Sequence, residues 1–164
     1  MTYQNSRFEL QNRAEIYSQK RAIHCKKSLG FGNDGAVWET SRVSALKIEE
    51  RRQGFDRELA VYQRLAERGI SKICDCDVAK LIDWDEELLA IEIGIIFPPY
   101  ILDFAKSYLD HPPDFSAEVM AEWELETQEL FEDDWPLVKK ILRELRRLGI
   151  YYLDAKPANI RLRN

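Results

Sequence analysis

Cysteines and long apolar runs are both scarce in this chain of 164 residues. Its three cysteines, Cys25, Cys74 and Cys76, are too few and odd in number for a disulfide framework. Cys74 and Cys76 are one residue apart and have no second cysteine pair, so their spacing does not favour a zinc site. No stretch approaches the ~18 uninterrupted apolar residues of a membrane span, and the N-terminal segment lacks the apolar core of a signal peptide. We therefore expect a cytoplasmic protein with no membrane partner, although export without a cleaved signal would leave the same pattern.

Positive charge is also in short supply. Lysine and arginine total 24 against 29 for aspartate and glutamate, which gives a formal net charge of −5 at pH 7. Phosphate contacts need a basic face, so this balance argues against nucleic acid as a partner. Apolar residues make up 45% of the chain, which is ordinary for a globular protein about the size of one domain. Such a domain buries roughly 70% of the surface that its unfolded chain exposes.

The N-terminal half of the sequence predicts strands around one main helix. Residues 55–68 carry apolar side chains at a 3.6-residue period, and Gly69 follows as a stop signal. Residues 80–84 and 88–93 alternate around an acidic turn and predict a hairpin. The other predicted elements are a polar leader helix at 8–24 and strands at 25–31, 36–40 and 43–48.

The pattern changes at Pro98-Pro99, a dipeptide that neither a central strand nor a helix interior tolerates. Ser116 suits the N-cap of a later helix, and Pro136 suits the first turn of the next. Helices are predicted at 100–110, 116–132 and 136–148. We therefore predict an α+β fold in which residues 1–97 contain a five-stranded sheet and residues 98–164 form a shorter helical part.

The first motif with chemical meaning is a glycine cluster between two predicted strands, Gly30-Phe-Gly32-Asn-Asp-Gly35-Ala-Val37. Glycines at this spacing let a hairpin close over phosphates, because backbone N–H groups can reach the ligand. A tight hairpin that binds no ligand is the alternative. A dinucleotide-binding fold would need the glycines to open a helix, whereas Ala36-Val37-Trp38 continues as a strand.

Lys47 and Glu58 form a second candidate pair. Lys47 lies ten residues after Val37 on the next predicted strand, and taken alone it reads as an exposed side chain. Glu58 falls on the buried side of the 55–68 helix, where an unpaired charge is costly, so we expect it to pair with Lys47. A glutamate at the solvent edge of the helix is the alternative. Because a lysine in a cleft adds little core packing, we expect Lys47→Ala to keep the fold.

The most specific motif is Tyr152-Leu-Asp154-Ala-Lys156-Pro-Ala-Asn159-Ile160, which follows a predicted amphipathic helix. An aspartate at the base of a loop can accept the proton of an attacking hydroxyl, and an asparagine amide oxygen can bind Mg²⁺. Phosphoryl transfer depends mainly on positioning and charge neutralisation of this kind. A simple turn after a helix is the alternative interpretation.

Taken in order, these motifs resemble the protein kinase superfamily from about residue 25 to residue 164. The resemblance implies a two-lobed protein kinase-like fold with a five-stranded N-lobe, residues 1–97, and a truncated helical C-lobe, residues 98–164. It implies catalytic roles for Asp154 as the base, Lys156 as its phosphate-facing neighbour and Lys47, with Asn159 as a metal ligand. The nucleotide-binding residues that it implies are Gly30, Gly32, Gly35, Val37, Ala45, Lys47, Glu58, Glu92 and Ile93.

The chain also departs from that family. Tyr152-Leu153 stands where the family has His-Arg, and Arg161 falls where the floor of the adenine pocket is normally apolar. The metal-binding Asp-Phe-Gly motif, which the family carries after the asparagine, is missing downstream of Asn159. The segment Lys80-Leu-Ile-Asp83-Trp84 looks like that motif but lies upstream of Asp154, within a predicted hairpin. We therefore interpret Asp83 as structural.

The resemblance implies a protein that uses ATP and Mg²⁺ to transfer a γ-phosphoryl group to a serine or threonine hydroxyl of a protein substrate. Lys156 favours a protein acceptor over a small molecule. The missing metal ligand favours the alternative, a pseudokinase that serves as a nucleotide-binding or protein-interaction module with a regulatory partner, because the metals carry much of the charge stabilisation. We expect any transfer to be slower than the ~1–100 s⁻¹ typical of kinases.

Overall fold

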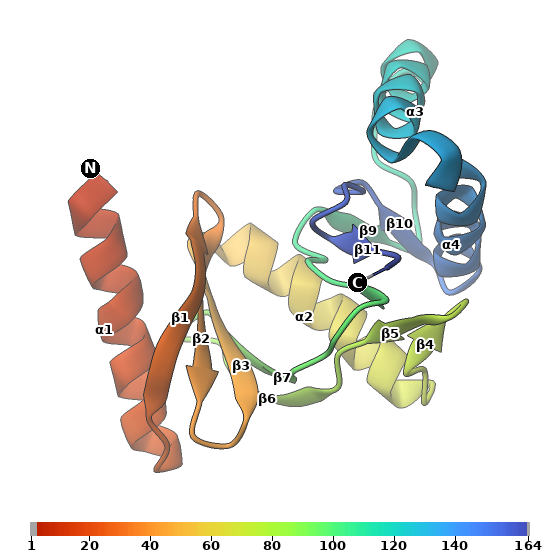
Figure 1. Ribbon diagram of the computed structural model, residues 1–164. Coiled ribbons are helices and arrows are strands. Elements are labelled where there is room, and N and C mark those ends of the chain that lie inside the picture. Colours follow the sequence, from red (N-terminus) through yellow and green to blue (C-terminus); the bar gives the residue numbers. More distant parts are fainter. Residues whose placement is uncertain (1–2, 164) are drawn as a thin grey trace.

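The computed structural model describes residues 3–163 and has a mixed α+β fold (Figure 1). Its largest sheet has the strand order β1-β2-β3-β7-β6, and every neighbouring pair is antiparallel. These strands are β1 (Cys25–Gly32), β2 (Gly35–Thr40), β3 (Ser44–Glu49), β6 (Leu81–Asp85) and β7 (Ala90–Gly94). The five strands predicted for this half of the chain are confirmed, each with small shifts at its ends.

Helices α1 (Tyr3–Arg21) and α2 (Arg52–Glu67) pack on opposite faces of this sheet (Figure 1). Side chains alternate along β3 and β7, so each strand supplies one set of apolar residues to each helix. The set that packs with α1 comprises Leu46, Ile48 and Ala90, and Ala36 of β2 joins it. The set on the side of α2 comprises Ala45, Ile91 and Ile93. Both predicted helices of this half are confirmed, although α1 begins earlier than expected.

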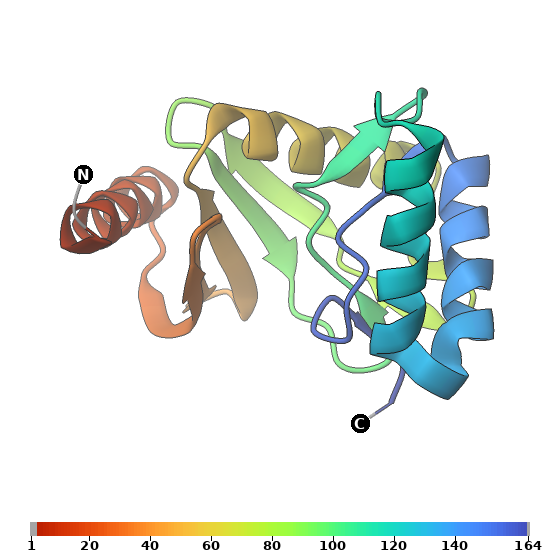
Figure 2. The ribbon, with the colours of Figure 1, turned by 90° about the horizontal axis from the view of Figure 1, so that it is seen from above.

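Beyond Pro98-Pro99 the chain forms two more helices, α3 (Ala117–Phe131) and α4 (Trp135–Arg147), which lie side by side (Figure 2). The side chain of Ser116 accepts a hydrogen bond from the Val119 amide and caps α3, as predicted. Pro136 lies in the first turn of α4. A short 3-10 turn, Glu132–Asp134, joins the two helices.

The predicted helix at 100–110 is wrong. Tyr100–Ile101 form β8 and Ser107–Leu109 form β9. Strand β8 pairs antiparallel with β11 (Ile160–Arg161), and β9 pairs antiparallel with β10 (Ile150–Tyr152). Strands of two or three residues carry no readable period, so pairing with distant segments decides their structure. The remaining short strands, β4 (Lys72–Ile73) and β5 (Cys76–Val78), extend the β11-β8 sheet on its other side.

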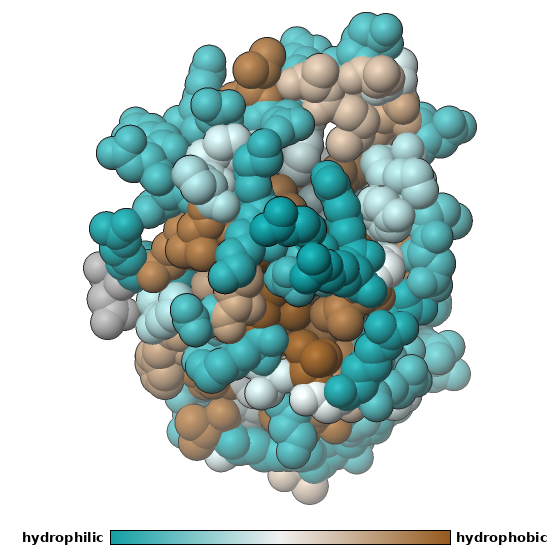
Figure 3. Space-filling model, turned by 90° about the vertical axis from the view of Figure 1, so that its right-hand side faces the viewer, coloured by the Kyte–Doolittle hydropathy of each residue, from teal (hydrophilic) through white to brown (hydrophobic). Residues whose placement is uncertain are grey.

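The face that carries α3 and α4 is mostly hydrophilic, with apolar areas between the charged side chains (Figure 3). The exposed basic residues of α4 are Lys139, Lys140, Arg143, Arg146 and Arg147. Within residues 3–163, no helix has both the length and the apolar content needed to cross a bilayer.

Candidate functional site

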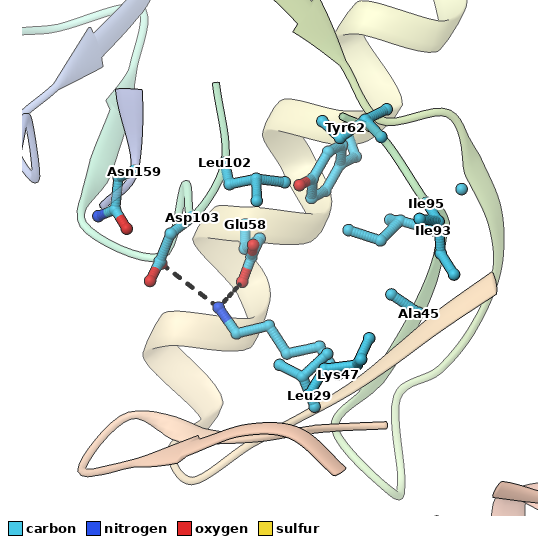
Figure 4. Close-up of a pocket in the computed structure, with 13 residues that line it drawn as sticks. Leu29, Ala45, Lys47, Glu58, Tyr62, Ile93, Ile95, Leu102, Asp103 and Asn159 are labelled. Atoms are coloured by element: carbon cyan, nitrogen blue, oxygen red, sulfur yellow. Dashed lines mark hydrogen bonds and ion pairs between the residues drawn. The ribbon is translucent and has the colours of Figure 1, made fainter. Parts of the chain in front are cut away.

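A cavity of about 280 Å³ lies where the large sheet, α2 and the segment after β8 meet (Figure 4). Apolar side chains from β1, β2, β3, β7 and the segment after β8 form much of its wall: Leu29, Val37, Ala45, Ile93 and Leu102. Lys47, Glu58, Asp103 and Asn159 bring charged and polar groups to the same space. The cavity therefore joins an apolar region to a charged one.

Lys47 is the charged centre of this cavity. Alternation along β3 turns its side chain away from α1, and only 12% of that side chain is exposed. Its Nζ lies 2.6 Å from a carboxylate oxygen of Glu58, 2.6 Å from one of Glu49 and 3.3 Å from one of Asp103. Burial opposes the charge on the lysine, but the three carboxylates together hold the pKa of Lys47 well above its usual value. The predicted pairing of Lys47 with Glu58 is confirmed.

Glu49 is the third carboxyl group beside Lys47, so the cluster has more acidic groups than the lysine can neutralise. It is 1% exposed, and its Oε1 is paired with Lys47 in a contact whose angles do not form a hydrogen bond. The other carboxyl oxygen of Glu49 lies 2.9 Å from the position that a Cβ on Gly54 would take. Glycine at position 54 therefore leaves space for the Glu49 carboxyl group. Burial raises the pKa of Glu49 to about 9 and outweighs the lowering effect of Lys47. The adjacent Glu58 raises this pKa further. The raised pKa favours a proton on Glu49 at neutral pH.

That proton gives the stability of the fold a dependence on pH. Between the ordinary pKa of glutamate, ~4.3, and about 9, only the folded state keeps the proton. The contribution of Glu49 to stability is therefore complete below pH ~4.3 and is lost as the pH rises toward 9. Glu49→Gln, a neutral mimic of the protonated form, should remove this slope. We expect its melting temperature to exceed that of the parent by at least ~3 °C at pH 8 and to differ little at pH 5.

Melting followed by circular dichroism from pH 5 to pH 9 measures this difference. Glu129→Gln is the matched control, because Glu129 is exposed on α3, and its profile should run parallel to that of the parent. A Glu49→Gln variant that is less stable than the parent by a constant amount at every pH would contradict the protonated state of Glu49.

Asp154, Lys156 and Asn159 come together after β10, as the motif predicts. The Asn159 side-chain amide donates to the backbone oxygen of Asp154 at 3.0 Å and to its Oδ2 at 2.8 Å. The Nζ of Lys156 lies 3.2 Å from the same Oδ2. Asn159 also lines the cavity, and its amide oxygen lies on the side of Asp103 (Figure 4). The loop thus holds the Asp154 carboxylate, which is 14% exposed, next to the cavity.

Asp103 is the charged residue of the cavity that the sequence reasoning missed. It follows β8 with a φ of 62°, and the pairing of β8 with β11 brings it near Asn159. Phe104 is fully buried, and its ring packs edge-on against Tyr62 and Tyr152 at centroid distances of 5.3 and 5.5 Å. These contacts fix the backbone that presents Asp103. The sequence does contain a pattern that could have pointed to Asp103, because Asp103-Phe104-Ala105 differs from Asp-Phe-Gly only in its last residue.

The three glycines of the predicted phosphate loop form the β1–β2 hairpin but are not part of the cavity wall. A Cβ on Gly35 would lie 2.2 Å from the carbonyl oxygen of Ile48, so strand pairing alone requires glycine there. Added Cβ atoms at Gly30 and Gly32 would meet no atom within 4 Å. The hairpin therefore leaves open space at these two positions, and their contact with phosphates stays a prediction.

Glu92 was predicted among the nucleotide-binding residues, and a contact between this part of β7 and a nucleotide stays a prediction. Alternation along β7 turns its side chain toward α1, while Ile93 lines the cavity. The Glu92 carboxylate is fully buried and accepts hydrogen bonds from Tyr17 at 2.8 Å and Ser44 at 2.5 Å. Its side chain thus ties the sheet to α1 instead of reaching the cavity.

Two further sequence interpretations concern residues at the edge of the site. Asp83 accepts a 2.6 Å hydrogen bond from Arg21 of α1, which confirms its structural role. Arg161 is exposed on β11, and Leu102 provides the apolar wall in that part of the cavity. The charge of Arg161 therefore does not interrupt the apolar lining.

No protein-family model matches this chain, and a search of the curated proteins finds no similar sequence. The functional interpretation therefore depends on the side chains around the cavity. Apolar walls, a buried ammonium group and oxygen donors suit a ligand that has a flat apolar part and an anionic part.

Proposed function

We propose that the chain is a protein kinase-like phosphotransferase that binds Mg·ATP in this cavity. The proposal includes a two-lobed arrangement, with residues 1–97 and 98–164 on either side of the nucleotide, and a serine or threonine hydroxyl of a protein as the acceptor. One observation carries it: Lys47, Glu58, Asp103 and Asn159, from four separate segments, converge on one cavity. Asp154 is hydrogen-bonded to the last of these.

The shape and charge of the cavity support nucleotide binding. Adenine would lie against the apolar wall that Ala45, Ile93 and Leu102 form, and Lys47 would contact the α- and β-phosphates. The ion pair with Glu58 holds Lys47 toward the cavity. The volume of about 280 Å³ is just below the ~300–1,000 Å³ typical of ligand pockets. The phosphates would therefore extend out of the cavity under the glycine hairpin.

Asp103 and Asn159 fit a magnesium ion. Both offer oxygen atoms, which hard divalent cations prefer, and both line the same cavity. The Asn159 side-chain nitrogen faces Asp154, so its oxygen is the atom directed to a metal. Asp103 would supply the carboxylate that the family carries after the asparagine, here from a segment that precedes it in the chain. Bound there, Mg²⁺ would neutralise charge on the β- and γ-phosphates.

Asp154 would act as the base in the transfer step. The acceptor hydroxyl oxygen forms a bond to the γ-phosphorus while the bond to the bridging oxygen of ADP breaks, and the hydroxyl proton passes to the Asp154 carboxylate. Asn159 and Lys156 hold that carboxylate in place. Lys156 also carries a positive charge beside the transferring group.

A nucleotide-binding module without transfer is the second candidate. Ala105 stands where the family has the glycine of Asp-Phe-Gly, and Tyr152 stands where it has the histidine. Tyr152 is buried and donates a 2.7 Å hydrogen bond to the Leu102 carbonyl. Both departures lie beside the segment that presents Asp103, which favours binding with altered or absent transfer.

Thermal melting with Mg·ATP tests the binding half of the proposal. At ~100 times its dissociation constant a ligand stabilises the folded state by about 2.7 kcal/mol, a rise of roughly 5–10 °C for a chain of this size. Ala45→Leu should abolish the rise, because the added atoms fill the apolar part of the cavity. Ala117→Leu adds the same atoms at an exposed site on α3 and should keep it. A rise that survives Ala45→Leu would place the nucleotide elsewhere.

A further inference from the structure

Lys106 links two segments that lie on either side of the candidate site. It follows Asp103-Phe104-Ala105, and a hydrogen bond from the Ser107 amide to the Phe104 carbonyl closes the turn that contains it. Its Nζ lies 3.6 Å from Oδ2 of Asp34, in the turn of the glycine hairpin, and 3.6 Å from Oδ1 of Asp154. One ammonium group thus stands between the hairpin tip and the proposed base.

The ion pair between Lys106 and Asp34 contributes little to stability. The Lys106 side chain is 51% exposed, and that of Asp34 is 55% exposed. Exposed ion pairs contribute about 0–1 kcal/mol, because water screens them and both side chains lose freedom. The buried neighbours Phe104 and Ala105 nevertheless fix the backbone from which Lys106 projects. A cation that projects from this fixed backbone toward Asp154 is placed to act as a ligand-binding group.

The electrostatic surroundings keep Lys106 charged. Partial burial opposes its charge, but the carboxylates of Asp154, Asp34 and Asp103 outweigh that effect and raise the pKa of Lys106. Asp103 also contacts Lys47 at 3.3 Å, so one carboxylate stands near both lysines. A polyphosphate that runs past Asp103 from Lys47 toward Asp154 would meet Lys106 at its far end.

We infer that Lys106 binds the terminal phosphate of a nucleoside triphosphate, exchanging Asp34 and Asp154 for phosphate oxygens, and thereby makes the site prefer triphosphates to diphosphates. This inference rests on the proposed function, since it uses the same cavity and the same nucleotide. Lysine binds phosphate as a point charge with three donors, and the exchange needs only a rotation of its flexible stem.

Calorimetric titration of the full chain with Mg·ATP and with Mg·ADP tests this role. For Lys106→Gln, the dissociation constant for Mg·ATP should rise roughly tenfold, the effect of losing one charged hydrogen bond, while that for Mg·ADP changes less than about twofold. Lys106→Arg keeps the charge and should keep the preference for the triphosphate. Lys139→Gln is the matched control, because Lys139 is 56% exposed and pairs with Glu124 at 3.2 Å on the surface formed by α3 and α4.

Each outcome decides the inference. Selective loss of Mg·ATP affinity in Lys106→Gln alone supports it. Equal losses for both nucleotides, or no loss for either, overturn it while leaving the proposed function in place. A parent chain that binds neither nucleotide overturns the proposed function and this inference with it. Because Lys106 is half exposed, circular dichroism melting should show that its variants fold like the parent.

Discussion

Replacing Lys47 with methionine is expected to lower the free energy of unfolding by about 3 kcal/mol or more, because it leaves a buried carboxylate without its partner. Methionine keeps most of the side-chain volume but removes the ammonium group. Glu58 is 1% exposed, and the Nζ of Lys47 is the hydrogen-bond donor that reaches its Oε2 at 2.6 Å. The sequence-based expectation that a Lys47 substitution keeps the fold is therefore replaced by one of strong destabilisation.

Urea unfolding followed by circular dichroism measures this loss. Lys72→Met is the matched control, since Lys72 is 59% exposed in its ion pair with Asp77, and its stability should stay close to that of the parent. The double variant Lys47→Met/Glu58→Gln removes both charges and should recover part of the stability, which makes the two substitutions non-additive. Additive losses of stability would show that the cluster does not depend on the lysine. A loss in Lys47→Met no larger than the loss in Lys72→Met would show the same.

Asp154→Asn is expected to slow phosphoryl transfer about 10²–10⁴-fold, the usual contribution of a general base, while Mg·ATP binding stays within about twofold. The amide has nearly the shape of the carboxylate and can still accept the hydrogen bond from Asn159. It cannot take the proton of an acceptor hydroxyl. A loss in turnover without a loss in nucleotide affinity would therefore separate the base from the binding site.

The measurement is label transfer from γ-labelled ATP to a protein mixture, with the labelled amino acid identified afterwards. Asp77→Asn serves as the matched control, because Asp77 pairs with Lys72 outside the cavity. Label that survives Asp154→Asn at the parent rate would exclude Asp154 as the base. Tight nucleotide binding by a parent chain that transfers no label would leave the nucleotide-binding module as the function.

The sequence predicted most of the large sheet and its helices because each of these elements carries its own periodic pattern. Phe55, Leu59 and Tyr62 repeat at helical spacing and are all buried against the sheet. Strands β6 and β7 alternate around an acidic turn in the same local way. The pairing of Lys47 with Glu58 followed from the cost of an unpaired carboxylate on the buried side of a helix.

The parts that sequence reasoning missed depend on contacts between distant residues. Asp103 enters the cavity only because β8 and β9 pair with β11 and β10, and these strands are too short to show a pattern. The third carboxylate at Lys47, Glu49, was missed for a related reason. It lies two residues away on the same face of β3, but only the fold shows that both side chains turn to the same buried cluster and pair at 2.6 Å. The partner of the Glu92 side chain, Tyr17, was also not predicted, because it lies in a helix whose docking site the sequence does not reveal.

The pairing of β8 with β11 and of β9 with β10 also sets an order of events during synthesis on the ribosome. Lys47, Glu58 and Asp103 are all made before Asp154, and about 50 residues separate the last two, roughly 3–10 s of elongation at ~5–20 residues per second. During that interval the edges of β8 and β9 that later receive β11 and β10 have no partner strand. The lysine cluster can therefore form on the nascent chain, whereas the Asp103–Asn159 side of the cavity closes only when the last strands dock.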